Sequence, residues 1–219
     1  MTLKILQGPR AKHFGGHNDP TMWTLHATVS ATRVGGAMAT ANFFHTEELP
    51  TSAHYVIDPK NIVQCLPENV VAYHCGHNQD SIGIELCIYP LLGSMTNWLK
   101  PKSKRKKLKQ HQAVAPITWL RPRVRRMLRL AAKLTAEGMH KRGVEPTFRG
   151  VAQLKTWERN HHDKKYGGVT THNNMSQAFH ESTHWDPGAW PQNAYMKMLR
   201  QEYAALQKSK KAPAKGKGK

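Results

Sequence analysis

The segment SIGIELCIY, residues 81–89, carries the clearest structural pattern of the chain. Its isoleucine and leucine residues alternate with Gly83, Glu85 and Cys87, which predicts a β-strand with one apolar face. An isolated glutamate on the other face of such a strand is most often exposed to solvent. Beside a metal site, however, the same carboxyl group would be a candidate general base. We therefore predict a strand here and single out Glu85.

Three further segments alternate in the same way. Residues 22–30, 52–58 and 62–66 are predicted strands, and the last two form a hairpin across the turn DPKN. In the first of them, MWTLHATVS, His26 falls on the face opposite to the apolar residues. The pattern therefore sets this histidine apart from the predicted core.

Helical spacing follows in three places. GGAMATANFF, residues 35–44, predicts a short helix that carries Ala39, Asn42 and Phe43 on neighbouring turns. Pro122 suits the first turn of a longer helix that stops at Gly143. Its apolar stripe comprises Val124, Met127, Leu128, Ala131 and Leu134. A last helix is expected over about residues 191–207. Its inward positions are Tyr195, Met198, Leu199 and Tyr203.

This order of elements predicts an α/β single domain over residues 1–207. The chain has 219 residues, which is enough for one well-formed core. Its formal net charge of +19 points to an anionic partner: nucleic acid, acidic lipid or an acidic cell-wall polymer. The basic run KPKSKRKKLKQH, residues 100–111, is predicted to be a solvated insertion, and the Lys-rich tail 208–219 to be disordered.

The three cysteines, Cys65, Cys75 and Cys87, show no CxxC spacing. Free and mostly buried thiols are the expected state, and a disulfide framework is not. Cys75 directly follows His74, so it is kept as a possible metal ligand.

The segment THNNMSQAFHESTHWDPGAW, residues 171–190, concentrates metal-binding side chains. It holds His172, His180 and His184 together with Asp186 in an Asp-Pro-Gly turn, and the distant strand supplies His26. A catalytic zinc takes three protein ligands and leaves a fourth position for water. Imidazoles and one carboxylate from distant segments therefore predict a catalytic metal site.

Taken in order, five segments resemble the zinc-dependent N-acetylmuramoyl-L-alanine amidases of the type 2 family. They are LHATVS, SAHYVID, VVAYHCGHNQDSIGIEL, the TH of GGVTTHNN, and HWDPGAW, and they cover roughly residues 22–190. The family includes phage lysozyme-like amidases and peptidoglycan-recognition proteins, and the chain resembles endolysins of actinobacterial phages in particular. The resemblance implies a central mixed β-sheet flanked by helices. It also implies cleavage of the amide between N-acetylmuramic acid and L-alanine of the stem peptide.

The resemblance further implies how the site is built. One zinc ion would be held by His26, His172 and Asp186, and Glu85 would orient and deprotonate the attacking water. His184 stands where the family often has a lysine, and it would stabilise the oxyanion.

The other histidines are assigned from their context. His180 lies in the interval between the second and third ligands, which is longer than the family pattern, and it is the alternative second ligand. His54 and His74 lie in matching motifs and are expected to line the substrate groove or to satisfy local hydrogen bonds. Histidines without motif context are treated as surface residues: His13, His17, His45, His161 and His162.

Other functions stay open at this point. A basic nucleic-acid-binding protein or metal-dependent nuclease would use the charge, but the basic residues cluster without aromatic interleaving. A non-catalytic peptidoglycan-recognition module would lack the third ligand, whereas Asp186 is present. A recycling amidase inside the cytoplasm fits the charge less well than attack on intact wall.

The expected partners follow from these points. We expect a monomer that binds peptidoglycan, and that binds anionic wall polymers through the basic insertion and the tail. No specific nucleic acid and no stable membrane insertion are expected, because no apolar run is long enough to span a bilayer. The start of the chain lacks the apolar core of a secretion signal. The resemblance to phage enzymes implies synthesis in the host cytoplasm and release through a holin-like pore.

Overall fold

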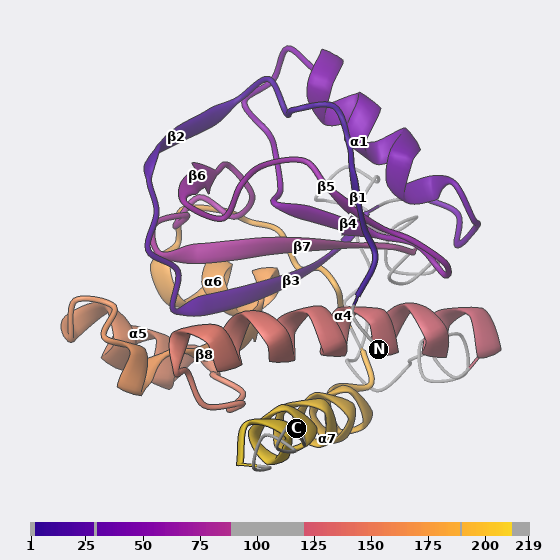
Figure 1. Ribbon diagram of the computed structural model, residues 1–219. Helices are drawn as coiled ribbons and strands as arrows, with labels where there is room; N and C mark the ends of the chain where they lie inside the picture. Colours follow the sequence, from indigo (N-terminus) through magenta and orange to yellow (C-terminus); the bar gives the residue numbers. More distant parts are fainter. Residues whose placement is uncertain (1–2, 29, 89–120, 189, 212–219) are drawn as a thin grey trace, which may run out of the picture.

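The computed structural model describes residues 3–28, 30–88, 121–188 and 190–211 (Figure 1). A six-stranded sheet lies at its centre, in the order β1-β5-β4-β7-β3-β8. The strands are β1 Ile5–Gln7, β3 Met22–Thr28, β4 Tyr55–Ile57, β5 Ile62–Gln64, β7 Ser81–Cys87 and β8 Gly168–Thr171. Strands β4, β7, β3 and β8 are parallel, whereas β5 runs antiparallel to β4. The predicted mixed sheet and the β4–β5 hairpin are therefore confirmed.

Helices and a small second sheet surround the central sheet (Figure 1). The helices are α1 Gly36–Thr46, α4 Pro122–Arg142, α5 Val151–Arg159, α6 His172–Phe179 and α7 Gln192–Lys211, with a 3-10 turn η2 at Lys164–Tyr166. Strands β2 Phe14–His17 and β6 Val70–Ala72 pair antiparallel in the second sheet. In the described part of the chain, no helix has both the length and the apolar character that a bilayer crossing requires.

The paired strands β3 and β7 present their apolar residues on the same side of the sheet. Trp23, Leu25 and Ala27 lie opposite Ile82, Ile84 and Leu86 in the parallel register, and all six are buried. Helix α4 covers this side closely, because a Cβ atom added to Gly138 would lie only 3.0 Å from Cζ2 of Trp23. The absence of a side chain on Gly138 therefore lets the helix approach the indole ring.

Helix α4 has the predicted limits. It begins at Pro122, and Gly143 caps its end with a left-handed φ of 68°, a conformation that favours glycine. All five residues of the predicted apolar stripe are buried. Helix α7 packs beside it (Figure 1).

Helix α7 corrects one predicted boundary. It continues to Lys211, so residues 208–211 are helical and not part of a disordered tail. Lysines are good helix formers, and Lys208 and Lys210 interact favourably with the negative end of the helix dipole. Of the predicted inward positions, Met198 is half-buried and the other three are buried. The basic run 100–111 and the rest of the tail lie outside the described residues.

Helix α1 forms where it is predicted, and Ala39, Asn42 and Phe43 lie on its exposed face. The buried face contains Ala41 and Phe44. Phe43 keeps 48% of its surface exposed, so its apolar character alone does not indicate the core-facing side.

Candidate active site

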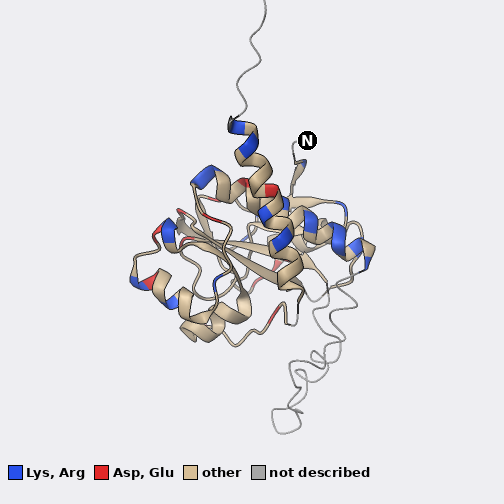
Figure 2. Cartoon of the chain, turned by 90° about the horizontal axis from the view of Figure 1, so that it is seen from below, with Lys and Arg blue, Asp and Glu red and all other residues tan. Residues whose placement is uncertain are grey.

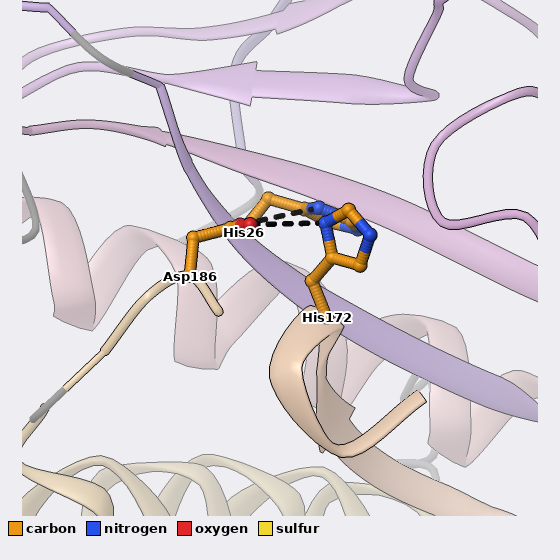
Figure 3. A group of neighbouring side chains, drawn as sticks. All are labelled: His26, His172 and Asp186. Atoms are coloured by element: carbon orange, nitrogen blue, oxygen red, sulfur yellow. Dashed lines mark ion pairs between the residues drawn. The ribbon is translucent and has the colours of Figure 1, made fainter. Parts of the chain in front are cut away.

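The candidate site lies on the side of the sheet that faces away from α4. His26 on β3 and Glu85 on β7 are register partners, so their side chains emerge side by side. His172 follows the end of β8 directly and is the first residue of α6, and Asp186 comes from the loop after that helix. Figure 3 shows the side chains of His26, His172 and Asp186 pointing toward one another. The carboxyl ends of parallel strands thus assemble groups from distant segments, as is common in α/β folds.

Three of these side chains bring their polar atoms within 4.8 Å of one another. Nδ1 of His172 lies 3.0 Å from Oδ1 of Asp186, and Nδ1 of His26 lies 3.4 Å from Oδ2. Both histidines are buried, with 1% of His26 and 5% of His172 exposed. Two imidazoles and one carboxylate that converge in this way are suited to hold a metal ion.

The backbone fixes the position of Asp186. The amide of Ala27 donates to Oδ2 of Asp186 at 3.1 Å, and the amide of Asn173 donates to its carbonyl oxygen at 2.9 Å. Helix α6 occupies most of the interval between His172 and Asp186. The unusually long spacing in the sequence is therefore compatible with close contact between the two ends.

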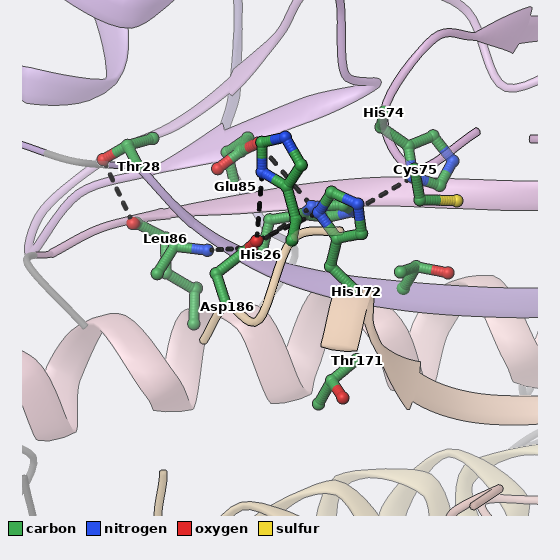
Figure 4. Close-up of polar contacts among 12 residues, drawn as sticks. His26, Thr28, His74, Cys75, Glu85, Leu86, Thr171, His172 and Asp186 are labelled. Carbon is green, nitrogen blue, oxygen red and sulfur yellow. Dashed lines mark hydrogen bonds and ion pairs between the residues drawn. The ribbon is translucent and has the colours of Figure 1, made fainter. Parts of the chain in front are cut away.

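Each histidine uses its second ring nitrogen inside the protein. Nε2 of His26 lies 3.0 Å from Nδ1 of His74 (Figure 4). Nε2 of His172 lies 3.0 Å from Oγ of Ser182. If each Nε2 carries the proton and donates it, the Nδ1 atoms are left as lone-pair donors directed at the site. This arrangement orients a metal-binding histidine and sets its tautomer, so the residues fit a bound metal.

The surroundings shift the pKa values of the site in different directions. Burial would raise the pKa of Asp186, but its contacts with the imidazoles of His172 and His26 outweigh it and hold this pKa well below its usual range. Burial, reinforced by His172, lowers the pKa of His26 to about 4. Asp186 is therefore ionised and His26 neutral near pH 7, which are the states that bind a cation.

Glu85 differs from Asp186 in its partners. Its Oε1 lies 3.9 Å from Nδ1 of His26, and its Oε2 is buried without a hydrogen-bond partner. Burial and the negative charge of Asp186 raise the pKa of Glu85 well above its usual range. A buried carboxyl group with an unused oxygen and a raised pKa is suited to exchange a proton with a reactant.

His184 lies beside the group and closer to solvent. Its ring stacks on that of His172, with centroids 4.7 Å apart and planes at 9°, and its Nδ1 lies 3.9 Å from Oδ1 of Asp186. Its side chain is 61% exposed. Burial and the neighbouring His172 lower the pKa of His184. His180 caps the end of α6 and does not join the group of His26, His172 and Asp186.

The comparisons with known proteins show the family of the chain. Residues 16–189 match the family described as N-acetylmuramoyl-L-alanine amidase. The chain belongs to this family. A search of curated protein sequences returns no match.

Several solved structures share the fold of this amidase. The hydrolase AmiA of Staphylococcus aureus, solved in complex with its ligand, has a TM-score of 0.63 at 15% identity, over 98% of this chain and 89% of that one. A mutant endolysin from Bacillus subtilis has a TM-score of 0.53 at 18% identity, over 90% and 99%. The amidase LysC of Clostridium intestinale has a TM-score of 0.51 at 15% identity, over 91% and 99%.

A cleft of about 660 Å³ opens beside the candidate site of the amidase. One wall is formed by the segment after β6, including Tyr73 and His74, and the other by the loop that follows α6, from His180 to His184. His172, Pro50 and Thr51 also line the cleft. A substrate in this cleft would therefore reach the converging side chains.

His54 and His74 share one role expected from the sequence, but the structure gives them different surroundings. His74 is buried, lines the cleft and contacts His26. His54 has no exposed surface, and its two ring nitrogens contact the Val70 carbonyl oxygen and the Gly83 amide. The expectation that His54 lines the substrate groove is therefore wrong, and it satisfies local hydrogen bonds instead.

Gly83 explains how His74 reaches the site. A Cβ atom added to Gly83 would lie 2.6 Å from Cγ of His74, so only glycine leaves room for the imidazole against β7.

The cysteines are free and buried, as predicted. The Cys75 thiol donates to the carbonyl oxygen of His77 at 2.9 Å and does not join the metal-binding group.

Sequence reasoning missed Ser182, which gives no signal of its own beyond lying between the second and third predicted ligands. It also treated His162 as a surface residue, although only 13% of that side chain is exposed. Two ring nitrogens of His162 contact carboxylates, which explains its partial burial.

Proposed function

We propose that this amidase hydrolyses the amide between the lactyl group of N-acetylmuramic acid and L-alanine of the peptidoglycan stem peptide, with one bound zinc ion. The observation that carries the proposal is the convergence of His26, His172 and Asp186 beside the buried carboxyl group of Glu85. Membership of the amidase family supports the substrate class. The ligand set of two imidazoles and one carboxylate supports zinc.

Zinc held by His26, His172 and Asp186 would supply a Lewis acid and lower the pKa of a water molecule from about 15.7 to about 7. Glu85 then accepts a proton from the attacking water as the water adds to the lactyl carbonyl carbon. Glu85 returns this proton to the alanine nitrogen as the amide bond breaks. Its raised pKa favours uptake of the proton, and its buried Oε2, which has no hydrogen-bond partner, is available to receive it.

His184 stabilises the negative charge that develops on the carbonyl oxygen. Burial and the neighbouring His172 lower its pKa, which favours the neutral ring and a role as a hydrogen-bond donor. Stacking on His172 limits the orientations of its ring.

Purified muropeptides test the proposed reaction directly. We expect separate glycan and stem peptide, identified by mass, in the presence of zinc. Activity should disappear with a chelator and return when zinc is added. Intact substrate under all conditions would contradict the proposed reaction, and full activity after exhaustive metal removal would contradict the role of zinc.

A second part of the proposal concerns attachment to the wall. Exposed basic residues recur along α4 and α7, among them Arg125, Arg126, Arg129, Lys197 and Arg200, and Figure 2 shows Lys and Arg along both helices. With a net charge of +19, we propose that this surface, the 100–111 run and the tail bind anionic wall polymers. Removal of residues 212–219 takes away three lysines. We expect the truncated protein to cosediment with walls less than the wild type does at low salt, and to the same extent as the wild type at high salt.

The biological role that we propose is lysis of a host cell wall. It is supported by the likeness in fold to solved structures, one of which is an endolysin from Bacillus subtilis. A nuclease would use the same charge differently, and metal-dependent nicking of plasmid DNA by the wild type would favour it. Lysis of intact cells from outside by the wild type, but not by the Glu85→Gln variant, is the result expected for a wall amidase.

A further inference from the structure

A second group of histidine and carboxylate side chains lies apart from the candidate active site. It consists of His77 in the loop between β6 and β7, Glu158 in the last turn of α5, and His162 in the turn after that helix. Nε2 of His77 lies 2.7 Å from Oε2 of Glu158, and Nε2 of His162 lies 2.6 Å from the same oxygen. Three ligand-type atoms thus converge on one point.

Each imidazole has a second carboxylate behind it. Nδ1 of His162 lies 2.8 Å from Oδ2 of Asp80, and Nδ1 of His77 lies 3.2 Å from Oε1 of Glu181. Metal-binding histidines in proteins typically donate their other N–H to a carboxylate, a carbonyl group or water. Both histidines of this group have that arrangement, with Nε2 directed inward and Nδ1 directed at the outer carboxylate.

The two imidazoles have too few N–H groups for all of their contacts with carboxylates, and this favours a cation in the group. The group has four close contacts between ring nitrogens and carboxylate oxygens, and ionised carboxylates only accept hydrogen bonds. Two neutral imidazoles carry only two N–H groups. When both are used toward Asp80 and Glu181, the two Nε2 lone pairs and Oε2 of Glu158 face one another. These atoms lie at hydrogen-bond spacing, so a divalent cation would move them slightly apart and replace the repulsion by three coordinate bonds.

Packing holds the two rings in place. The ring of His162 stacks on Trp157, with centroids 4.0 Å apart and planes at 20°, and the ring of His77 stacks on Phe179 at 3.9 Å and 20°. Trp157 is fully buried. The ligands therefore do not have to be ordered from a flexible state when an ion binds, which reduces the entropic cost of binding.

The group is also accessible to ions from solvent. The side chain of Glu158 is 43% exposed, whereas those of His77 and His162 are 15% and 13% exposed. The group therefore has a solvent-facing carboxylate and two sheltered imidazoles.

We propose that His77, Glu158 and His162 bind a second divalent transition-metal ion, separate from the candidate active site. Imidazole and carboxylate ligands together suit zinc and its first-row neighbours, with water completing the coordination. The ion joins the β6–β7 loop to the end of α5.

The proposed ion has a structural consequence for the cleft. Cys75 and Gly76 precede His77 and line one wall, and Glu181, which contacts His77, lines the other. The ion therefore fixes the position of His77, and His77 connects the two walls of the cleft. It takes no part in the chemistry.

Zinc stoichiometry tests this proposal on the full chain. After equilibration in a zinc buffer that fixes a low free concentration, elemental analysis should give two zinc ions per chain for the wild type. The Glu158→Gln and Asp186→Asn variants should each retain one ion, and the double variant none. Glu158→Gln keeps the size of the side chain but removes the charged ligand, and its circular dichroism spectrum shows whether it folds.

His161→Ala is the matched control. His161 precedes His162 and also has a left-handed backbone, with φ of 51°, but it is exposed and lies outside the group. This variant should keep two zinc ions, which excludes loss of binding through a change in the turn. One zinc ion in the wild type, lost in Asp186→Asn and kept in Glu158→Gln, would overturn the second site and leave the proposed amidase function intact.

The outer carboxylate gives an independent measurement. In the Asp186→Asn background, Asp80→Asn should weaken zinc binding about 10- to 100-fold, because His162 loses the partner that orients its ring. An unchanged affinity would show that the contact between His162 and Asp80 serves the packing of the loops only.

Discussion

Two groups of two imidazoles and one carboxylate lie in this amidase, and they differ in what surrounds them. The first, His26, His172 and Asp186, is buried at the ends of parallel strands and presents Nδ1 atoms. The second, formed by His77, Glu158 and His162, lies on loops and a helix end and presents Nε2 atoms. Both have the ligand types that a metal requires, so the ligands alone do not distinguish a catalytic site from a structural one.

The surroundings supply the distinction. The outer partners of the first group are the neutral side chains of His74 and Ser182, whereas those of the second are carboxylates. Among the described residues, Glu85 is the carboxyl group with a buried oxygen that lacks a hydrogen-bond partner, and it lies beside the first group. In the second group, Glu158 and the outer carboxylates of Asp80 and Glu181 already contact histidine. A proton acceptor that is not yet used therefore marks the site of chemistry.

The sharpest test exchanges two glutamates for glutamine, Glu85 beside the first group and Glu158 within the second. Glu85→Gln should lower kcat for muropeptide hydrolysis by about 10²- to 10⁴-fold, the usual contribution of general acid–base catalysis. Glu158→Gln should leave kcat within about two-fold, because Glu158 contacts no reacting atom. Steady-state kinetics with zinc at saturation measures both.

Zinc content is the control for this pair. Glu85→Gln should still bind zinc at the first group, since Glu85 is not one of its three ligands. An equal loss of kcat in the two variants would break the comparison, because it would give both groups a part in catalysis.

Much of the first group could be predicted from sequence. His26 and Glu85 lie in strands with clear alternation, and His172 and Asp186 lie in one compact segment. The burial of His54 could not be predicted, because it depends on the carbonyl group of Val70 and the amide of Gly83, which belong to other strands. Local alternation reports which face a residue occupies but not what covers that face.

The sequence gives a weaker signal for the second group. His77 and Glu158 are 81 residues apart, and His77 lies in a loop whereas Glu158 lies in the last turn of α5. The only local signal is the spacing of Glu158 and His162, four residues apart, which places two ligands on one side of a helix end. Short elements were also missed, because β8 and β6 have four and three residues and owe their pairing to neighbouring strands.

The second prediction concerns the glycines that make room for each group. Gly83→Ala should cost about 3 kcal/mol of unfolding free energy, at the upper end of the usual range for overpacking, because the new Cβ meets the ring of His74 at 2.6 Å. Gly76→Ala meets Cβ of Glu181 at 2.8 Å and adds strain at φ of 84°. Chemical denaturation measures both losses.

Activity separates the two glycine variants. Gly83→Ala displaces His74, which contacts His26, so it should also lower kcat, whereas Gly76→Ala should mainly weaken the second zinc ion. Gly16→Ala is the control, because nothing lies within 4 Å of its Cβ, and a change of less than about 0.5 kcal/mol is expected. If Gly83→Ala is as harmless as Gly16→Ala, His74 is not packed tightly against β7.

The smallest effects come from two adjacent residues in the loop after α6, each of which supports a different group. Ser182 contacts Nε2 of His172, and Glu181 contacts Nδ1 of His77. Ser182→Ala should weaken zinc at the first group about 10-fold, or about 1.4 kcal/mol, and Glu181→Gln should weaken zinc at the second by a similar factor. Competition with a chromophoric chelator measures each affinity in a background that lacks the other site.

The outcome depends on whether each substitution changes the zinc affinity of its own group only. Thr183→Ala, which changes the next residue along the same cleft wall, should alter neither affinity. If Ser182→Ala also weakens the second ion, the loop couples the two groups and they are not independent. If each substitution acts on its own group alone, neighbouring residues of one loop orient the histidine ligands of two separate metal ions. The unused carboxyl group of Glu85 then remains the feature that makes only one of the two groups catalytic.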